Sequence, residues 1–121
     1  MDKWQALYEF WGGFGCEAYE QNSVPDRDDI EYPYITYPAA SGLFDSGTFV
    51  TASVWTRSSS WELADSISDA IEAELSRGGK TVRYEDGLIW ITAGQPFSQS
   101  MGDPEDDKIK RKVLTVYYAF L

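Results

Sequence analysis

An alternating segment followed by an amphipathic one, within residues 48–79, constrains the fold more than any other part of the chain. In residues 48–56 small aliphatic side chains alternate with larger or polar ones, which is the period of a β-strand that buries one face. In residues 61–75 apolar side chains recur every three or four positions, as on a helix with one buried side. A strand that leads directly into such a helix predicts a two-layer protein in which the helix covers the sheet.

The predicted helix carries signals at both of its ends. Ser59 and Glu62 have the spacing of a capping box, in which each side chain accepts a hydrogen bond from a backbone N–H at the helix start. Gly78 and Gly79 allow the left-handed backbone that ends a helix. The apolar stripe of the helix consists of Trp61, Ala64, Ile67, Ile71 and Leu75. A second stripe, called the acidic stripe below, consists of Glu62, Asp65, Asp69 and Glu72.

Residues 4–11 predict a second, shorter helix. Its large side chains have the spacing of one helix face, Asp2 stands at the N-cap position, and Gly12 follows the last turn. Exposed aromatic side chains at this spacing would indicate a partner surface. We expect them in the core instead. These side chains are Trp4, Leu7, Tyr8 and Trp11.

Further strands are predicted at residues 34–37, 80–84, 88–92 and 113–121, with loops at residues 15–32 and 94–108. Pro33 and Pro38 bracket the first of these strands, which predicts a sheet edge. Asp86-Gly87 predicts a hairpin between two others. The last strand is apolar on both faces, so it is central in the sheet or covered by a partner. The fold predicted is α+β, a mostly antiparallel sheet of about five strands with two helices packed on one face.

Composition limits the domain organisation and the classes of partner. A chain of 121 residues predicts a single domain, residues 1–121, with a core of its own. There is no run of about 20 apolar residues and no basic start before an apolar segment, so we expect no membrane partner and a reducing cytoplasm. The net charge of −10, from 20 acidic and 10 basic residues, argues against specific nucleic-acid binding.

Side chains that carry catalysis are scarce. Histidine is absent, and Cys16 stands next to Glu17, which raises rather than lowers a thiol pKa. The acidic runs at residues 26–29 and 103–107 lack the pattern of a calcium loop, and the glycines at residues 12–15 lack the ending of a phosphate loop. We therefore expect no enzyme, no catalytic residue, no metal site and no cofactor, with only weak divalent-cation binding left open.

Short motifs across residues 33–121 resemble the tail terminator proteins, also called tail completion or minor tail proteins, of long-tailed phages and prophages. The motifs are Pro33-Tyr-Ile-Thr-Tyr37, Val54-Trp-Thr56 with the serines that follow, Gly78-Gly79, Asp86-Gly87, Gly94-Gln-Pro-Phe97, Ile109-Lys-Arg111 and Tyr117-Tyr-Ala-Phe-Leu121. Residues 17–31 have no counterpart in that pattern.

The resemblance implies a structural protein of the virion, a single tail-terminator-like α+β domain without enzymatic activity. Such a protein forms a homo-oligomeric ring of six subunits on the last ring of the tail-tube protein. There it ends tube polymerisation and offers the surface that head–tail connector proteins join. The resemblance places the chain at the head-proximal end of the tail, and in the host cytoplasm during assembly.

A reversal of charge sign before the last strand is our predicted contact between ring subunits. A ring needs two different patches that complement each other, because each subunit meets its neighbour head to tail. The acids of one subunit facing the bases of the next would supply them. The residues are Asp103, Glu105, Asp106 and Asp107, followed by Lys108, Lys110, Arg111 and Lys112.

Two other functions stay open at this stage. A head–tail connector or neck protein of a phage shares the size and acidity of a tail terminator. An acidic module that mimics DNA and occupies the basic site of another protein is the second alternative, and the acidic stripe of the main helix supports it.

Overall fold

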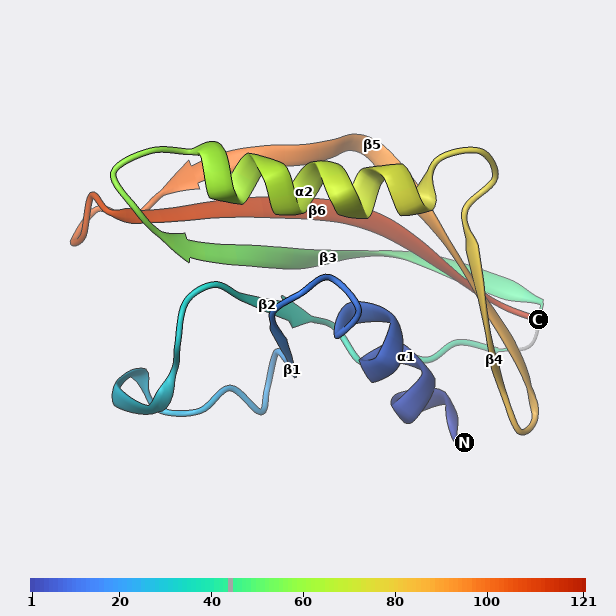
Figure 1. The fold of residues 1–121 in the computed structure, drawn as a ribbon. Helices are drawn as coiled ribbons and strands as arrows, with labels where there is room; N and C mark the ends of the chain where they lie inside the picture. Colours follow the sequence, from blue (N-terminus) through green and yellow to red (C-terminus); the bar gives the residue numbers. More distant parts are fainter. Residues whose placement is uncertain (44) are drawn as a thin grey trace.

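The structure is a computed structural model that describes residues 1–43 and 45–121. The described residues form two α-helices, one short 3-10 helix and six strands (Figure 1). In chain order the elements are α1 (Lys3–Trp11), β1 (Glu17–Glu20), the 3-10 helix η1 (Arg27–Asp29), β2 (Tyr34–Tyr37), β3 (Ser46–Arg57), α2 (Glu62–Leu75), β4 (Lys80–Tyr84), β5 (Gly87–Gly102) and β6 (Ile109–Phe120).

All six strands belong to one curled sheet with the order β1-β2-β3-β6-β5-β4. β1 and β2 run parallel, and every other neighbouring pair is antiparallel. The α+β class is therefore confirmed, whereas the sheet is mixed and has six strands rather than about five antiparallel ones. β6 lies between β3 and β5, so the prediction that it is central in the sheet is confirmed.

The additional strand, β1, lies within the predicted loop at residues 15–32. It escapes the sequence pattern because it is short and polar, with Glu17 and Glu20 at its ends and only Ala18 fully buried. β1 also removes β2 from the edge of the sheet, so the edge prediction is wrong. Pro33 and Pro38 stand just outside β2 and take no position in its hydrogen-bond ladder.

The long loop predicted at residues 94–108 is also wrong in most of its length. β5 continues to Gly102, and only residues 103–108 connect it to β6. A register shift between Ala93 and Ser98 interrupts the pairing with β6 and contains Pro96. A bulge accommodates a residue without a backbone N–H, and so the proline that indicated a loop lies inside a strand.

The start of α2 differs from the predicted capping box. The N-cap is Trp61, which has helical backbone angles and no side-chain cap, so the pairing of Ser59 with Glu62 is wrong. Instead the hydroxyl of Ser60 accepts a hydrogen bond from the N–H of Glu62 at 3.4 Å. The predicted end is closer to the structure, because Gly78 and Gly79 both have positive φ, at 98° and 84°.

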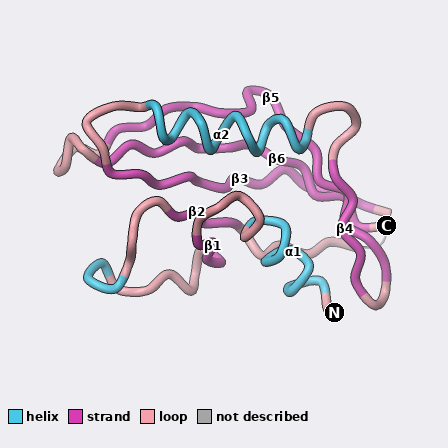
Figure 2. Tube along the Cα trace, viewed as in Figure 1, coloured by secondary structure: helices cyan, strands magenta, loops and turns pink. Residues whose placement is uncertain are grey.

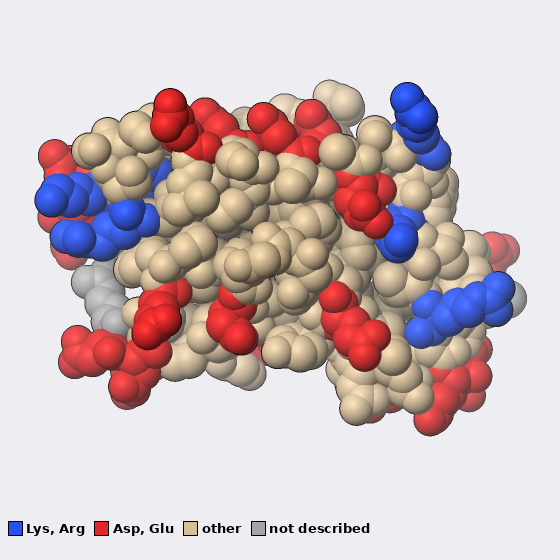
Figure 3. Space-filling view, in the orientation of Figure 1, with Lys and Arg blue, Asp and Glu red and all other residues tan. Residues whose placement is uncertain are grey.

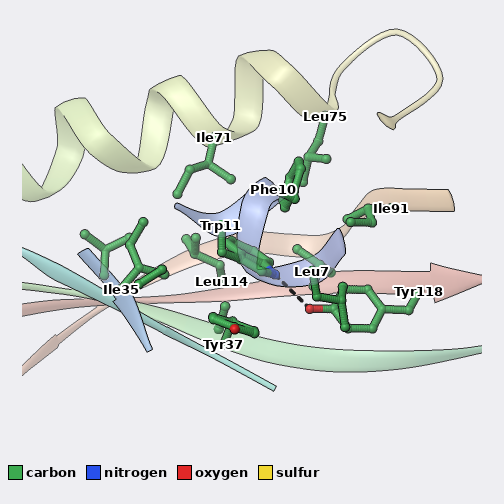
Figure 4. Packing of buried hydrophobic residues seen from close by; sticks show 14 of the residues in the cluster. Leu7, Phe10, Trp11, Ile35, Tyr37, Ile71, Leu75, Ile91, Leu114 and Tyr118 are labelled. Carbon is green, nitrogen blue, oxygen red and sulfur yellow. Dashed lines mark hydrogen bonds between the residues drawn. The ribbon is translucent and has the colours of Figure 1, made fainter. Parts of the chain in front are cut away.

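Both helices pack on the same face of the sheet and share one hydrophobic core (Figure 4). Ile71 of α2 and Leu7 and Trp11 of α1 are fully buried there against Leu114 and Tyr118 of β6. Trp11 Nε1 donates a hydrogen bond to the hydroxyl of Tyr118 at 2.9 Å, across the centre of the core. α1 also contacts β1 and β4, which are the two edge strands of the sheet. The curled sheet therefore surrounds this helix.

The orientation of α1 corrects half of its predicted core. Asp2 is the N-cap and forms a capping box with Gln5, as two hydrogen bonds of 2.9 and 3.1 Å show. Trp4 and Tyr8, however, are exposed, by 43% and 49%. The helix presents a neighbouring side to the core because Ala6 and Phe10, which the predicted stripe omitted, are buried with Leu7 and Trp11.

Candidate interaction surfaces

The predicted ring contact, residues 103–112, forms the turn between β5 and β6 and the start of β6. Its acids stabilise this turn within their own subunit. Asp103 Oδ1 accepts hydrogen bonds from two following backbone N–H groups, at 2.8 and 3.2 Å. Asp106 accepts from the N–H of Lys108 at 3.0 Å and from Arg57 Nε at 3.2 Å. The Lys108 hydrogen bond, helped by the one from Arg57, lowers the pKa of Asp106.

The lysines of the same segment also contact their own subunit. Lys112 Nζ lies 2.6 Å from Asp65 Oδ1 and 2.8 Å from Ser100 Oγ, and only 13% of its side chain is exposed. The ammonium groups of Lys110 and Lys112 lie 5.7 and 5.5 Å from the ring centre of Trp61. Through these contacts both lysines, which belong to β6, hold the start of α2 against the sheet.

Arg111 points to the sheet face opposite the helices, called the outer face below. Its guanidinium carbon lies 4.4 Å from the ring centre of Trp55, and its Nε donates to Ser53 Oγ at 3.1 Å. The ring of Trp55 stacks in turn on Tyr34, with 5.9 Å between ring centres. Burial lowers the pKa of Arg111. Sequence reasoning missed this cluster because its members come from three strands, and the cross-strand register alone brings them together.

Three of the eight residues predicted for the ring contact are left exposed without an ion pair among the described residues. They are Glu105, Asp107 and Lys108. Of the other five, Asp103 and Asp106 stabilise the turn, and Lys110 and Lys112 hold the start of α2. Arg111 packs on Trp55. Whether the exposed three meet a neighbouring subunit stays a prediction.

The outer face is nearly free of charge in its centre. Neighbouring residues on β3, β6 and β5 form three rows without a charged side chain. The first row contains Phe49, which is 67% exposed and whose ring lies 4.9 Å from that of Tyr117. Within the described residues no helix covers this face, because both helices contribute to the core on the other one. The rows are Phe49, Tyr117 and Thr92; Thr51 and Thr115; and Ser53, Val113 and Gln99.

A second exposed aromatic surface lies on α1. Trp4 and Tyr8 are its members, and the ammonium of Lys3 lies 4.9 Å from the ring centre of Trp4. On the other flank of the helix, a hollow of about 400 Å³ has Phe10 and Val82 among its lining residues. The outer face and α1 are thus two different surfaces with exposed aromatic side chains.

The described residues offer little for covalent or metal chemistry. Burial first, and then the charge of Glu17, raises the pKa of the Cys16 thiol, which keeps it protonated at neutral pH. Across residues 1–43 and 45–121 no three Cys, Asp or Glu side chains gather where they could hold a metal ion. No helix in the described part of the chain is long and apolar enough to cross a membrane.

No family model, curated protein or solved structure matches this chain. The surfaces described above and the short motifs that resemble tail terminators are therefore the basis for a function.

Proposed function

We propose that this chain is a structural virion protein that caps the tail tube of a long-tailed phage as an oligomeric ring of six subunits. The ring ends tube polymerisation and forms the surface that the head–tail connector joins. The observation that carries the proposal is the outer face, which no helix covers within the described residues and where Phe49 is 67% exposed. Its first two rows carry no charged side chain, and Arg111 reaches only Ser53 of the third row.

An uncharged face allows copies of this chain to associate although each carries a net charge of −10. Identical acidic subunits repel each other unless their contact surfaces lack charge or complement one another. Phe49 and Tyr117 supply apolar area at such a contact. Trp4 and Tyr8 supply a second, different apolar area, and a head-to-tail ring requires two different patches.

The acidic composition supports the same role from the inside of the ring. DNA passes through a tail terminator, and a lumen that carries carboxylates repels phosphates and does not hold the DNA. The chain has twice as many acidic as basic residues, 20 against 10. Its function in this proposal is self-association and contact with the tail-tube and connector proteins, without catalysis.

A glutamate on the outer face tests the proposal. Native mass spectrometry in the presence of purified tail tubes measures the ring, and electron microscopy shows whether it sits at the head-proximal end. We expect Phe49→Glu to abolish the ring while the circular dichroism spectrum is unchanged. Leu43→Glu is the matched control, since Leu43 is 83% exposed and lies in the loop before β3. The proposal would be refuted if wild-type protein stays monomeric in the presence of tail tubes.

A charge reversal at Lys108 tests the predicted pairing of acids and bases between ring subunits. Lys108→Glu reverses the charge of an exposed residue whose hydrogen bonds to Asp106 and Ser58 use only its backbone N–H and carbonyl groups. If the acid-to-base pairing between subunits is correct, this variant weakens the ring while leaving the fold intact. An unchanged ring would remove the pairing and leave the outer face as the contact.

One observation favours the acidic DNA-mimic alternative. Glu62, Asp69 and Glu72 of the acidic stripe are exposed and form no ion pair within the described residues. A protein that stays monomeric on tail tubes and binds a DNA-binding protein tightly would fit this function. A neck protein, in contrast, would bind DNA-filled heads in the absence of tails.

A further inference from the structure

β5 has an open edge over its last five residues. β4 pairs only with residues 87–91 of β5, whereas β6 pairs with β5 as far as Gly102. On the side away from β6, no described strand or loop forms a backbone hydrogen bond with residues 98–102. Figure 2 shows this part of β5 at the rim of the sheet. Backbone groups at such an edge are free to pair with another chain.

The hydrogen-bond pattern identifies which backbone groups are free. Leu88 and Leu121 exchange two backbone hydrogen bonds, of 3.0 and 2.9 Å. Bonded and non-bonded pairs alternate along an antiparallel ladder, so the odd-numbered residues of β6 bond to β5. Gln99 and Met101 lie opposite such residues and use their backbone groups in the ladder. The groups that point outward belong to Ser98, Ser100 and Gly102.

The open segment lacks the features that protect natural edge strands. Such strands usually carry a lysine, a proline or a bulge. Residues 98–102 read Ser-Gln-Ser-Met-Gly and contain neither a charge nor a proline. The bulge and Pro96 lie before the segment and leave it regular. An incoming strand therefore meets no electrostatic or steric obstacle on β5 itself.

Negative charge lies along the same rim. Lys112 Nζ contacts both Asp65 Oδ1 of the acidic stripe, at 2.6 Å, and Ser100 Oγ of the open edge, at 2.8 Å. The stripe therefore runs beside the edge, and Figure 3 shows acidic side chains gathered along the rim over α2. Lys112 neutralises only Asp65. The remaining three carboxylates of the stripe face solvent, as described above.

We propose that the open edge of β5 and the acidic stripe of α2 form one docking site for an extended, basic segment of a different protein. The segment adds to the sheet as a strand of about five residues, and its backbone pairs with Ser98, Ser100 and Gly102. Because side chains alternate along a strand, every second residue faces α2, and Lys or Arg at those positions meets the carboxylates.

The charges exclude a second copy of this chain as the occupant. Two copies that paired their β5 edges about a two-fold axis would bring two acidic stripes together. The basic run of the chain, residues 108–112, lies largely in β6, between β3 and β5, where it cannot reach another molecule as a free strand. The inference is independent of ring formation, which uses other surfaces.

A synthetic peptide of nine residues, blocked at both ends and with lysine alternating with threonine, serves as the probe. Fluorescence anisotropy measures its binding to the full chain at about 0.05 M and about 0.5 M salt, where screening weakens the charge contribution. Ser100→Pro removes an outward N–H and leaves the ladder with β6 in place. We expect it to weaken binding about fivefold or more, the equivalent of one lost hydrogen bond. Ser100→Ala keeps the outward N–H and should bind about fivefold or more tightly than Ser100→Pro.

A pair of charge variants tests the acidic stripe. Asp69→Asn with Glu72→Gln should weaken binding and reduce its salt dependence. Asp28→Asn with Glu31→Gln makes the same change in net charge in and just after η1, away from α2 in Figure 1, and should leave binding unchanged. The same peptide with glutamate in place of lysine should not bind.

Several outcomes would overturn the inference. These are equal binding by the Ser100→Pro and Ser100→Ala variants, equal effects of the two charge pairs, or a wild-type dimer that Ser100→Pro dissociates. If Ser100→Pro does not fold, a lysine–threonine peptide with alternate backbone nitrogens methylated replaces it. Undiminished binding of that peptide would overturn the inference as well.

Discussion

The hydroxyl of Tyr118 joins three distant parts of the chain. Its removal should therefore lower the free energy of unfolding considerably, although only one oxygen atom is lost. It accepts a hydrogen bond from Trp11 Nε1 at 2.9 Å and donates one to the carbonyl oxygen of Pro38 at 3.2 Å. Tyr118 and Trp11 are both fully buried. Tyr118→Phe keeps the ring and its packing but leaves a buried donor and a buried acceptor without a partner. Each such group costs about 1–3 kcal/mol, so we expect a loss of about 3 kcal/mol.

Urea denaturation at neutral pH, followed by tryptophan fluorescence, measures this loss. The midpoint should fall while the slope of the free energy with denaturant stays the same, because the surface exposed on unfolding does not change. Tyr8→Phe is the control, since the Tyr8 side chain is 49% exposed and the loss of its hydroxyl leaves no buried group without a partner. A loss below about 0.5 kcal/mol, or one equal to that of the control, would refute the reasoning that the hydroxyl is buried and satisfied only by these two groups.

The same variant also tests an alkaline limit to stability. Burial raises the pKa of Tyr118 above its ordinary value of 10.0, although the hydrogen bond from Trp11 opposes the shift. Its contribution to stability is therefore complete below about pH 10, and it is lost as the pH rises toward the folded-state pKa, because only the unfolded chain releases this proton. The stability difference between wild type and Tyr118→Phe should shrink as the pH rises above about 10. A constant difference would contradict this.

Two further variants probe a glycine and an ion pair. Gly79→Ala should cost about 2 kcal/mol, because φ is +84° and the added Cβ would lie 2.5 Å from a backbone carbonyl oxygen; Gly102→Ala, with open space around it, should be neutral in thermal denaturation. Lys112→Met should cost about 1 kcal/mol at low salt and less at high salt, because Asp65 loses its partner; Lys108→Met is the exposed control, and equal effects of the two would be evidence against the ion pair.

Local pattern predicted much of this fold. The strand at residues 48–56, the hairpin at Asp86-Gly87 and the buried stripe of α2 all follow from side-chain period or turn chemistry. The structure confirms them, except that Trp61 of the stripe is the N-cap and only half-buried. No side-chain period predicts β1, because a polar strand of four residues is too short to show one. The sequence predicts too short a strand for β5, because Pro96 indicates a loop as long as the register shift opposite β6 is unknown.

The surfaces were less accessible to sequence reasoning than the elements. The charge reversal predicts residues 103–112 as one contact segment, and these residues form the turn between β5 and β6 and the start of β6. Their individual roles depend on partners far away in the chain, such as Asp65 for Lys112 and Trp55 for Arg111. The acidic stripe was visible as a helical repeat, but its position beside an open strand edge was not.

The amino-acid sequence by itself determined the class of the fold, the acidic charge and the order of most elements, because these depend on composition and on contacts between near neighbours. Only the tertiary structure decided which side of α1 is buried, where the sheet has an open edge, and which charges remain free. Those properties arise when the sheet curls around α1 and β6 pairs on both sides, which brings together residues whose separation in the chain carries no local signal.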